Sequence, residues 1–487
     1  MTDTLVKRRG FLAGAGAGAL AGTLPQTAEA ATTKKKRTKR VDVCVIGAGL
    51  AGLTAARELR KRGLRVHVVE ADKRVGGRIW TVETKSGTTA NFGATFIGPG
   101  QDKIAALARE LGVKSHPTYN DGQNVLFFNG QRQTYTGTIP PIDPAALAEG
   151  ALLIEQINGM AQQLEAGAPW KHPRAREWDA QSFETFKLAN ARTAGARKLM
   201  DLVIEALFSV ESPEISLLYV LFYIKSAGNL NLLVDTAGGA QERQFTGGSQ
   251  QICEKLAAGL GKGAVTLRSP ARLVRTKGAR TTVVSDRIDV SCRRVVVAVP
   301  PTMVNRIAFE PGLAAMKDQL YQRMPFGSIG KGIAIYDEPW WRKKGLTGQA
   351  TADVGPMKAT FDLTPPSGKP GVLMGFVDAR DAREFSTWSR AERRARCVEQ
   401  FVTYFGEEAR NPKEFLDVLF DEEVWHRGCP VCFTAPGVLT AYGEQIHRRD
   451  GARHFATTET ATVWAGYMDG AVQAGQDVAE TIAKELS

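Results

Sequence analysis

The stretch that decides the fold reads Val41-Asp42-Val43-Cys44-Val45-Ile46-Gly47-Ala48-Gly49-Leu50-Ala51-Gly52. Its first half is a short run rich in β-branched residues with little polar alternation, which predicts a buried parallel strand. Leucine and alanine then recur at helical spacing as far as Gly63, and a second apolar run over 65–69 ends at Glu70. The pattern predicts a strand, a helix and a second parallel strand, which together form a βαβ unit.

The glycines of this unit are spaced as in a dinucleotide-binding turn. Gly47 permits the tight turn, Gly49 lets the backbone approach a pyrophosphate, and Gly52 lets the helix pack closely on the strand. The helix N-terminus then faces the phosphates. Glu70 lies where a carboxylate accepts hydrogen bonds from ribose hydroxyls. We therefore expect a nucleotide cofactor at residues 47–70.

A second glycine turn follows the acidic residue. The chain continues Arg74-Val75-Gly76-Gly77-Arg78. Gly77 brings backbone near the cofactor, and the guanidinium of Arg78 is suited to neutralising a phosphate. Enzymes that bind nicotinamide cofactors rarely need this second turn, so the pattern favours FAD.

Length and composition place the chain among globular proteins. It has 487 residues, 43% of them apolar and 23% charged, which is enough for two or three packed domains. Six scattered cysteines do not form a disulfide scaffold, and no second close pair of ligands accompanies Cys429 and Cys432. We expect no structural metal.

The net charge of +12 is concentrated at the N-terminus. Residues 1–40 hold nine Lys and Arg against two acidic residues, a net +7, which leaves +5 for the other 447 residues. A body this weakly basic does not indicate a nucleic-acid partner, and the basic tract lacks interleaved aromatic residues.

The first 30 residues resemble a twin-arginine export signal. Lys7-Arg8-Arg9-Gly10-Phe11-Leu12 precedes a weakly apolar stretch to Leu24 and the small-x-small pattern Ala28-Glu29-Ala30. We expect residues 1–30 to be the signal and 31–40 a basic linker, with export to the periplasm or the exterior. No later run offers the roughly 18 to 20 apolar residues that span a bilayer, so we expect no membrane anchor.

Four further blocks resemble the flavin-dependent monoamine oxidase family. They are residues 91–99, 238–249, 328–342 and 455–471. The resemblance covers nearly all of 41–487. It implies an α/β chain in which a Rossmann-like FAD-binding domain is combined with a discontinuous α+β substrate domain.

The same resemblance implies how the chain is divided. Residues 41–115, 246–320 and 423–487 would form the FAD-binding domain. Residues 116–245 and 321–422 would form the substrate-binding domain. The active site would lie between the two.

The matched blocks assign roles to individual residues. By resemblance, Lys331 holds a water at the flavin N5 and assists the reaction with oxygen. From the residues alone, a lysine in this strand-like run would instead face solvent. By resemblance, Tyr467 is one wall of an aromatic cage that orients the amine nitrogen, and Gln241 lines the substrate cavity. Glu459 and Met468 are implied contacts of the cofactor.

The sequence departs from the family pattern beside Cys429. Mammalian members carry a flavin-linked cysteine followed by the second cage tyrosine, but here Pro430 follows Cys429. Phe433 or Trp425 would have to supply the second ring. The residues leave three states open for Cys429: a thioether to the flavin, a disulfide with Cys432, or a free thiol.

The resemblance implies an FAD-dependent amine oxidase. A small amine becomes an imine and then an aldehyde and ammonia, while oxygen becomes hydrogen peroxide. On the same fold, an L-amino-acid oxidase would need an arginine facing the flavin, and a polyamine oxidase would need acidic groups along the cavity. A flavin-binding interaction protein without turnover is a third alternative. The sequence also allows a homodimer, and it does not identify the amine.

Overall fold

A computed structural model describes residues 38–137 and 140–487 of the chain. The predicted export signal lies outside these residues, as does most of the predicted linker. The end of that linker belongs to the folded body, because Thr38–Arg40 form strand β1, which pairs in parallel with β14 (Asp289–Cys292). The prediction of a linker as far as residue 40 was therefore wrong in its last three residues. Lys39 also donates to the carbonyl of Gly263, which fixes this strand on the body.

The predicted βαβ unit is present at the start of the body. Strand β2 (Val43–Ile46) leads into α1 (Leu50–Lys61), and β3 (Val66–Val69) returns in parallel beside β2. Every residue of both strands is buried, which agrees with the lack of polar alternation in the sequence.

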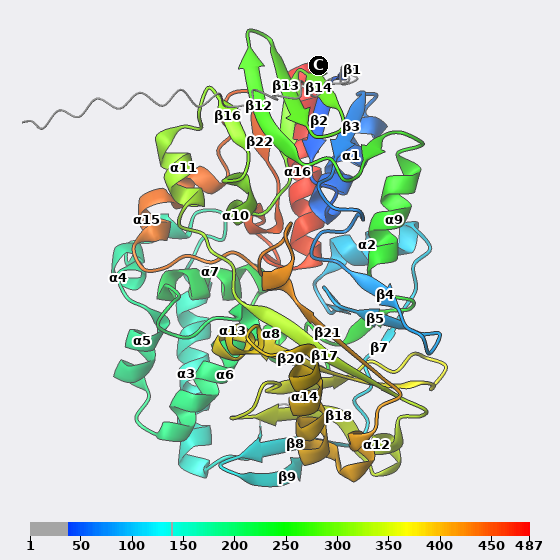
Figure 1. Ribbon diagram of the computed structural model, residues 1–487. Coiled ribbons are helices and arrows are strands. Elements are labelled where there is room, and N and C mark those ends of the chain that lie inside the picture. Colours follow the sequence, from blue (N-terminus) through cyan, green and yellow to red (C-terminus); the bar gives the residue numbers. More distant parts are fainter. Residues whose placement is uncertain (1–37, 138–139) are drawn as a thin grey trace, which may run out of the picture. The chain divides into compact units, whose positions relative to one another are not determined.

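A five-stranded parallel sheet grows from this unit in the order β11-β3-β2-β15-β22. Its other strands are β11 (Val265–Thr266), β15 (Arg294–Val297) and β22 (Arg453–Phe455). Strands from the beginning, middle and end of the chain therefore share one sheet. The terminal helix α16 (Met468–Leu486) lies beside α1 (Figure 1). Gly475 allows this approach, because a Cβ there would lie 2.5 Å from the carbonyl oxygen of Ala51.

A second five-stranded sheet lies against the first. Its order is β1-β14-β13-β12-β16, with β12 (Ala271–Lys277), β13 (Arg280–Ser285) and β16 (Ala308–Glu310). Val274 and Val283 of this sheet share a hydrophobic cluster with Ile46 and Val297 of the parallel sheet.

A seven-stranded mixed sheet forms the other large layer, in the order β21-β17-β20-β19-β18-β8-β9. Most neighbours in it are antiparallel, and β18 and β8 are parallel. Helix α14 (Arg390–Phe405) packs on this sheet and begins at a capping box formed by Ser389 and Glu392. The strands are β8 (Gln123–Phe128), β9 (Gln131–Tyr135), β17 (Ile329–Tyr336), β18 (Leu346–Ala352), β19 (Ala359–Asp362), β20 (Gly371–Asp378) and β21 (Glu414–Leu419).

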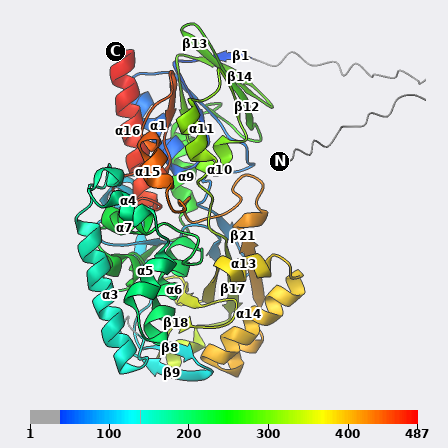
Figure 2. The ribbon, with the colours of Figure 1, turned by 90° about the vertical axis from the view of Figure 1, so that its left-hand side faces the viewer.

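A helical layer completes the body and has its own hydrophobic core. Figure 2 shows α3, α5 and α6 along one side of the mixed sheet. Within this layer α7 is the most enclosed helix, since ten of its eleven residues are buried. The helices are α3 (Pro144–Gln162), α4 (Ala175–Asp179), α5 (Phe183–Asn190), α6 (Ala194–Phe208), α7 (Leu217–Ala227) and α8 (Leu230–Val234).

Shorter elements connect these layers. The remaining strands are β4 (Thr81–Glu83), β5 (Thr89–Asn91), β6 (Phe96–Ile97), β7 (Ser115–Pro117) and β10 (Arg243–Phe245). The remaining helices are α2 (Asp102–Glu110), α9 (Gln250–Gly259), α10 (Pro301–Val304), α11 (Ala315–Tyr321), α12 (Trp340–Lys343), α13 (Ala379–Phe385) and α15 (Val438–Tyr442). Five 3-10 turns are η1 (Pro169–Lys171), η2 (Glu407–Arg410), η3 (Phe420–Glu422), η4 (Gly443–Ile446) and η5 (Thr458–Thr460).

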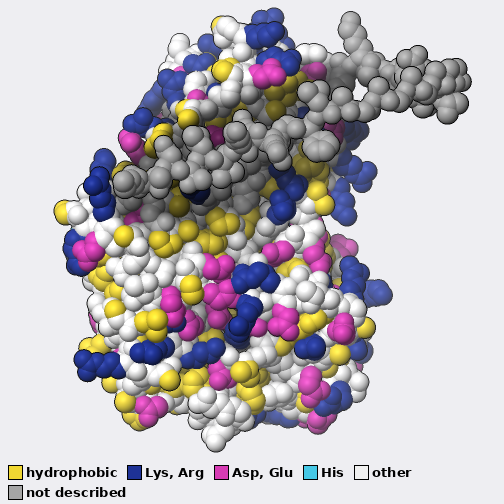
Figure 3. Space-filling view, turned by 60° about the vertical axis from the view of Figure 1, so that its left-hand side comes forward, with side chains coloured by type: hydrophobic (Ala, Val, Ile, Leu, Met, Phe, Trp, Pro, Cys, Tyr) yellow, Lys and Arg dark blue, Asp and Glu magenta, His cyan; other side chains and the backbone are white. Residues whose placement is uncertain are grey.

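The described residues give one connected body. Contacts join them into a single unit, so the predicted division into two domains stays a prediction. Within the described ranges, no helix combines the length and the apolar character that a membrane span requires. Acidic and basic side chains are interspersed on the face that Figure 3 shows.

Candidate active site

One cavity of about 490 Å³ contains residues from both the glycine turns and the mixed sheet. This volume is within the usual range for small-molecule and cofactor sites. Of the residues predicted from sequence, three do not line it: Gly52, Phe433 and Glu459. The predicted residues that do line it are Gly47, Gly49, Glu70, Gly77, Arg78, Gln241, Lys331, Trp425, Cys429, Tyr467 and Met468.

The glycine turn at the end of β2 has the geometry that the sequence predicted. Gly47 has a φ of +104°, and a Cβ there would lie 2.5 Å from the carbonyl oxygen of Ala298. A Cβ on Gly52 would lie 2.1 Å from the oxygen of Gly47, so Gly52 acts in packing, outside the cavity. At Gly49, in contrast, the nearest atom to such a Cβ is 4.0 Å away. This leaves room for a ligand at the start of α1.

Glu70 lies at the end of β3 and is 9% exposed. Its carboxylate accepts hydrogen bonds from the backbone amides of Ala48 at 2.5 Å and Asp72 at 2.8 Å. Burial raises the pKa of this carboxyl, and the two amides oppose the rise. Glu70 therefore braces the glycine turn while it also lines the cavity.

Arg78 is committed to a buried ion pair with Glu459. Its guanidinium donates to both carboxylate oxygens, at 2.6 and 3.1 Å, and to the carbonyl of Pro430 at 2.8 Å. Burial opposes ionisation of Glu459, but the charge of Arg78 and the hydrogen bonds from Arg78, Thr457 and Cys432 together lower the pKa of the carboxyl. The amide of Cys432 donates to the same carboxylate at 3.2 Å. The predicted phosphate contact of Arg78 therefore competes with a protein partner, and Glu459 lies behind the cavity wall.

Lys331 lies in β17, whose residues are all buried, and is itself 4% exposed. The alternative of a solvent-facing lysine was wrong. Its Nζ donates to the carbonyls of Asn91 at 3.1 Å and Gly93 at 2.6 Å, and to the Thr95 hydroxyl at 2.9 Å. Burial lowers the pKa of Lys331 to about 7, so its charge is lost near neutral pH.

Tyr467 lines the cavity beside a second tyrosine that the sequence did not single out. The Tyr223 ring centroid is 6.0 Å from that of Tyr467, and a hydrogen bond joins the two side chains. Gly466 permits this contact, because a Cβ there would lie 2.8 Å from the Tyr223 ring. The sequence of α7 is apolar on every side, so its pattern gave no sign that Tyr223 faces the cavity. The available signal was the Tyr223 hydroxyl, because a buried tyrosine hydroxyl usually needs a hydrogen-bond partner.

The two rings proposed as replacements for the lost cage tyrosine lie elsewhere. Phe433 is 5% exposed and packs in the hydrophobic core of the helical layer. Trp425 lines the cavity, but the guanidinium of Arg272 lies 5.9 Å from its ring, and Arg306 donates to the neighbouring Val424 carbonyl. Trp425 is thus on the side of β12 and α10.

Cys429 lines the cavity, and burial raises the pKa of its thiol to about 12. Cys432 packs in a different hydrophobic cluster with Leu320 and Met324. Both are free thiols in the structure, which does not contain the proposed disulfide between them. A thioether to the flavin stays a prediction.

Apolar and aromatic side chains dominate the cavity wall around Lys331 and Tyr467. The amide of Gln241 is anchored there by a bond from Nε2 to the Leu233 carbonyl at 3.0 Å. The apolar lining residues from this region are Phe92, Phe96, Ala206, Leu207, Ile329, Phe376 and Phe420.

Comparison with known proteins identifies the family. Residues 50–483 match the family described as flavin containing amine oxidoreductase. The chain belongs to this family. A Mycobacterium tuberculosis protein described as a flavin-containing monoamine oxidase is 40% identical over 92% of the enzyme and 97% of that protein. The flavin-containing amine oxidase of Oncorhynchus mykiss is 36% identical over 91% of the enzyme and 86% of that protein.

Solved structures show the same fold. A putrescine oxidase has a TM-score of 0.88 and 32% identity, over 91% of the enzyme and 99% of that chain. The cyclohexylamine oxidase of Brevibacterium oxydans has a TM-score of 0.88 and 29% identity, over 92% and 99%. The α/β fold with an FAD site, predicted from the sequence, is confirmed. The enzyme is an FAD-dependent amine oxidase.

The residues present fit this cofactor. The space beside Gly49, the first amides of α1 and the carboxylate of Glu70 suit a pyrophosphate and a ribose. The same cavity continues to Lys331 and Tyr467, so its apolar wall would hold the redox-active end of FAD. Within the described ranges, no group of acidic, histidine and cysteine side chains is arranged to hold a metal ion.

Proposed function

We propose that the enzyme oxidises a primary amine whose body is apolar. The observation that carries this proposal is the composition of the cavity around Lys331 and Tyr467, where aromatic and aliphatic side chains form the walls. The cyclohexylamine oxidase supports it, since the substrate in that protein's name has an apolar ring. Burial of such a ring supplies binding energy without an ionic partner.

A polyamine substrate fits this cavity less well. A second ammonium group would need a carboxylate, because an unpaired buried charge is costly. Among the described residues that line the cavity, Glu70 is the only acidic one, and it lies at the glycine turn. The resemblance to putrescine oxidase is therefore one of fold and family, and we do not extend that protein's substrate to this enzyme.

An amino-acid substrate meets the same difficulty with the opposite charge. Its carboxylate would need a free cation. The arginines among the described lining residues are Arg78, Arg272 and Arg306. Arg78 is paired with Glu459, while Arg272 and Arg306 contact the segment of Val424 and Trp425.

The chain's residues orient the amine and exclude water from it. When bound, FAD accepts the electrons of the amine and passes them to oxygen. The negative face of the Tyr467 ring attracts the amine nitrogen, and the bond from Tyr223 fixes the angle of that ring. Lys331 is the one lysine among the described residues that line the cavity, and its ammonium group would lie beside the reacting amine. The apolar wall keeps bulk water away.

A panel of amines tests the proposed substrate class. We expect kcat/KM for benzylamine to exceed that for putrescine and for L-phenylalanine by at least about a hundredfold, because the latter two would bury an unpaired charge. The measurement is initial-rate formation of hydrogen peroxide by the holoenzyme. A preference for putrescine or L-phenylalanine would contradict the proposal. Unchanged flavin absorbance with every apolar amine would contradict it as well.

Lys331 is proposed to assist the reaction with oxygen through its positive charge. The charged form is present below about pH 7 and is lost as pH rises through that value. We expect reoxidation of the reduced flavin to slow over this range, and Lys331→Met to be at least about tenfold slower and independent of pH there. Stopped-flow absorbance after mixing with oxygen measures both.

Lys317→Met is a matched control for that variant. Lys317 is also a buried lysine whose pKa burial lowers to about 7, but it does not line the cavity. This variant should keep the pH profile of the wild type. Equal oxygen reactivity in Lys331→Met and the wild type would remove Lys331 from the mechanism.

We also propose that the chain is exported, which rests on the N-terminal sequence alone. Replacing Arg8 and Arg9 together by lysine should leave the enzyme in the cytoplasm, because the twin-arginine pattern is read by the export machinery. Cell fractionation with peroxide detection measures this. Replacing Lys35 and Lys36 by glutamine is the control, since these residues follow the predicted cleavage site. Normal export of the Arg8→Lys, Arg9→Lys protein would overturn the proposal. The homodimer stays a prediction.

A further inference from the structure

One helix and two strands contribute to the cavity wall where the amine would lie. Helix α6 contributes Ala206 and Leu207, while β17 and β20 contribute Lys331 and Phe376. Lys331 and Phe376 are directly opposed in the sheet, and so are Ile329 and Asp378. Directly opposed side chains of antiparallel strands lie on the same face. Asp378 is therefore on the cavity-facing side of the sheet, two residues beyond Phe376.

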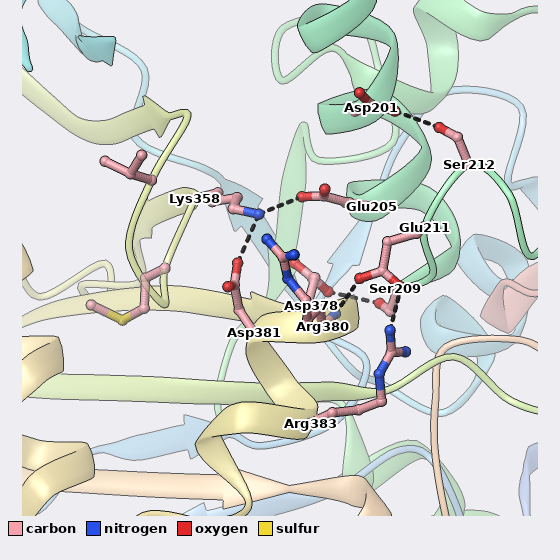
Figure 4. Close-up of polar contacts among 12 residues, drawn as sticks. Asp201, Glu205, Ser209, Glu211, Ser212, Lys358, Asp378, Arg380, Asp381 and Arg383 are labelled. Carbon is pink, nitrogen blue, oxygen red and sulfur yellow. Dashed lines mark hydrogen bonds and ion pairs between the residues drawn. The ribbon is translucent and has the colours of Figure 1, made fainter. Parts of the chain in front are cut away.

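A buried hydrogen bond joins the end of α6 to β20. The hydroxyl of Ser209, the residue after the last residue of α6, donates to Oδ1 of Asp378 at 2.7 Å (Figure 4). Ser209 is fully buried, and Asp378 is 9% exposed. The carbonyl of Ser209 also accepts the amide of Ser328, at 2.9 Å, in the turn before β17. The end of α6 is thus tied to both strands, two residues after Leu207.

The other polar contacts around this bond join more exposed groups. Figure 4 shows Lys358 between Glu205 and Asp381, at 2.8 and 2.7 Å. Glu211 accepts the amide of Arg380 and forms an ion pair with Arg383. The side chains of Lys358, Glu205 and Asp381 are 13–20% exposed, so this pair of contacts also connects α6 with the segment after β20. The bond from Ser209 is the more deeply buried contact and joins the end of α6 directly to the last residue of β20.

Asp378 is suited to holding this bond and is poorly suited to presenting a charge. Burial raises the pKa of its carboxyl to about 7, while the Ser209 hydroxyl and Lys358 oppose the rise and Glu205 and Asp381 add to it. It is not among the cavity-lining residues. A steric role through the position of α6 follows from these observations better than direct recognition of an ammonium group.

We propose that the hydrogen bond between Ser209 and Asp378 determines specificity by fixing how far Leu207 stands from Phe376. A fixed spacing between these two side chains would admit slim amines and reject broad ones. Both residues are positioning residues, since neither lines the cavity. The proposal rests on the proposed oxidation of apolar amines and adds the limit on their width.

Ser209→Gly tests the hydrogen bond between Ser209 and Asp378, which we call the clamp, with little damage to the backbone. Ser209 has a φ of +54°, a left-handed conformation that glycine adopts readily, and the substitution removes the hydroxyl together with the Cβ that carries it. We expect the ratio of kcat/KM for tryptamine to that for benzylamine to rise about three- to tenfold, mainly through a lower KM for tryptamine. Asp378→Ala deletes the acceptor instead and should shift the ratio in the same direction.

Two further variants separate the clamp from other causes. Asp378→Asn keeps an acceptor oxygen without the charge and should leave the ratio near that of the wild type. Thr347→Val removes another buried hydroxyl bond, to Asn124 at 2.6 Å, away from the cavity, and should also leave it unchanged. An unchanged ratio in Ser209→Gly overturns the proposal. So does a shift in Asp378→Asn as large as that in Ser209→Gly, which would attribute selection to charge.

Failure of the proposed function gives a different result. If the wild type oxidises neither amine, that function is wrong. The clamp is then tested by titrating the bound flavin's absorbance with the same two amines. An unchanged ratio of their dissociation constants in Ser209→Gly overturns the clamp in that case too.

Discussion

The buried ion pair between Arg78 and Glu459 is the constraint on which the site depends. It joins the second glycine turn to the C-terminal block across 381 positions of sequence, and it also holds the segment from Pro430 to Cys432. The Glu459 side chain is 1% exposed, so it would be costly without its cation. Residues at the two ends of the chain must therefore come together for either charge to be buried.

This constraint explains why one cavity serves two chemical tasks. The glycine turn of the parallel sheet provides backbone amides and the carboxylate of Glu70, which suit the polar part of FAD. The mixed sheet, α7 and the N-cap of α16 provide Lys331, Tyr223 and Tyr467, respectively, within an apolar wall. Because Arg78 is neutralised by Glu459, it leaves little free charge between the two regions. The substrate region is accordingly apolar, and its lysine, Lys331, loses its charge near neutral pH.

Local sequence predicted the parts of the structure that depend on neighbours along the chain. The βαβ unit follows from residues 41–70, since glycine spacing and hydrophobic pattern are local properties. Burial of Lys331 did not follow, because three acceptors from residues 91–95 surround its Nζ, and only the fold brings them there. Tyr223 was missed because α7 is enclosed on all sides and its sequence has no distinct cavity face.

The placement of Trp425 and of strand β1 also depended on contacts distant in sequence. Arg272 and Arg306 hold the Trp425 segment toward β12 and α10, and no local pattern announces such contacts. From the sequence, residues 38–40 were interpreted as part of a basic linker. In the structure they form β1, which pairs with β14. In both cases the sequence shows which residue is present, but contacts between distant segments determine where that residue lies.

The most direct test of the account is the affinity for FAD when Glu459 loses its charge. The Glu459→Gln substitution is made in a Cys429→Ala background, which removes the one thiol of the described cavity wall and with it any covalent link. Arg78 is then buried without a carboxylate, so FAD should dissociate roughly a hundredfold more readily and the unfolding midpoint should fall. Fluorescence of released flavin and thermal unfolding measure the two effects. An FAD dissociation constant and an unfolding midpoint equal to those of Cys429→Ala alone would contradict the account.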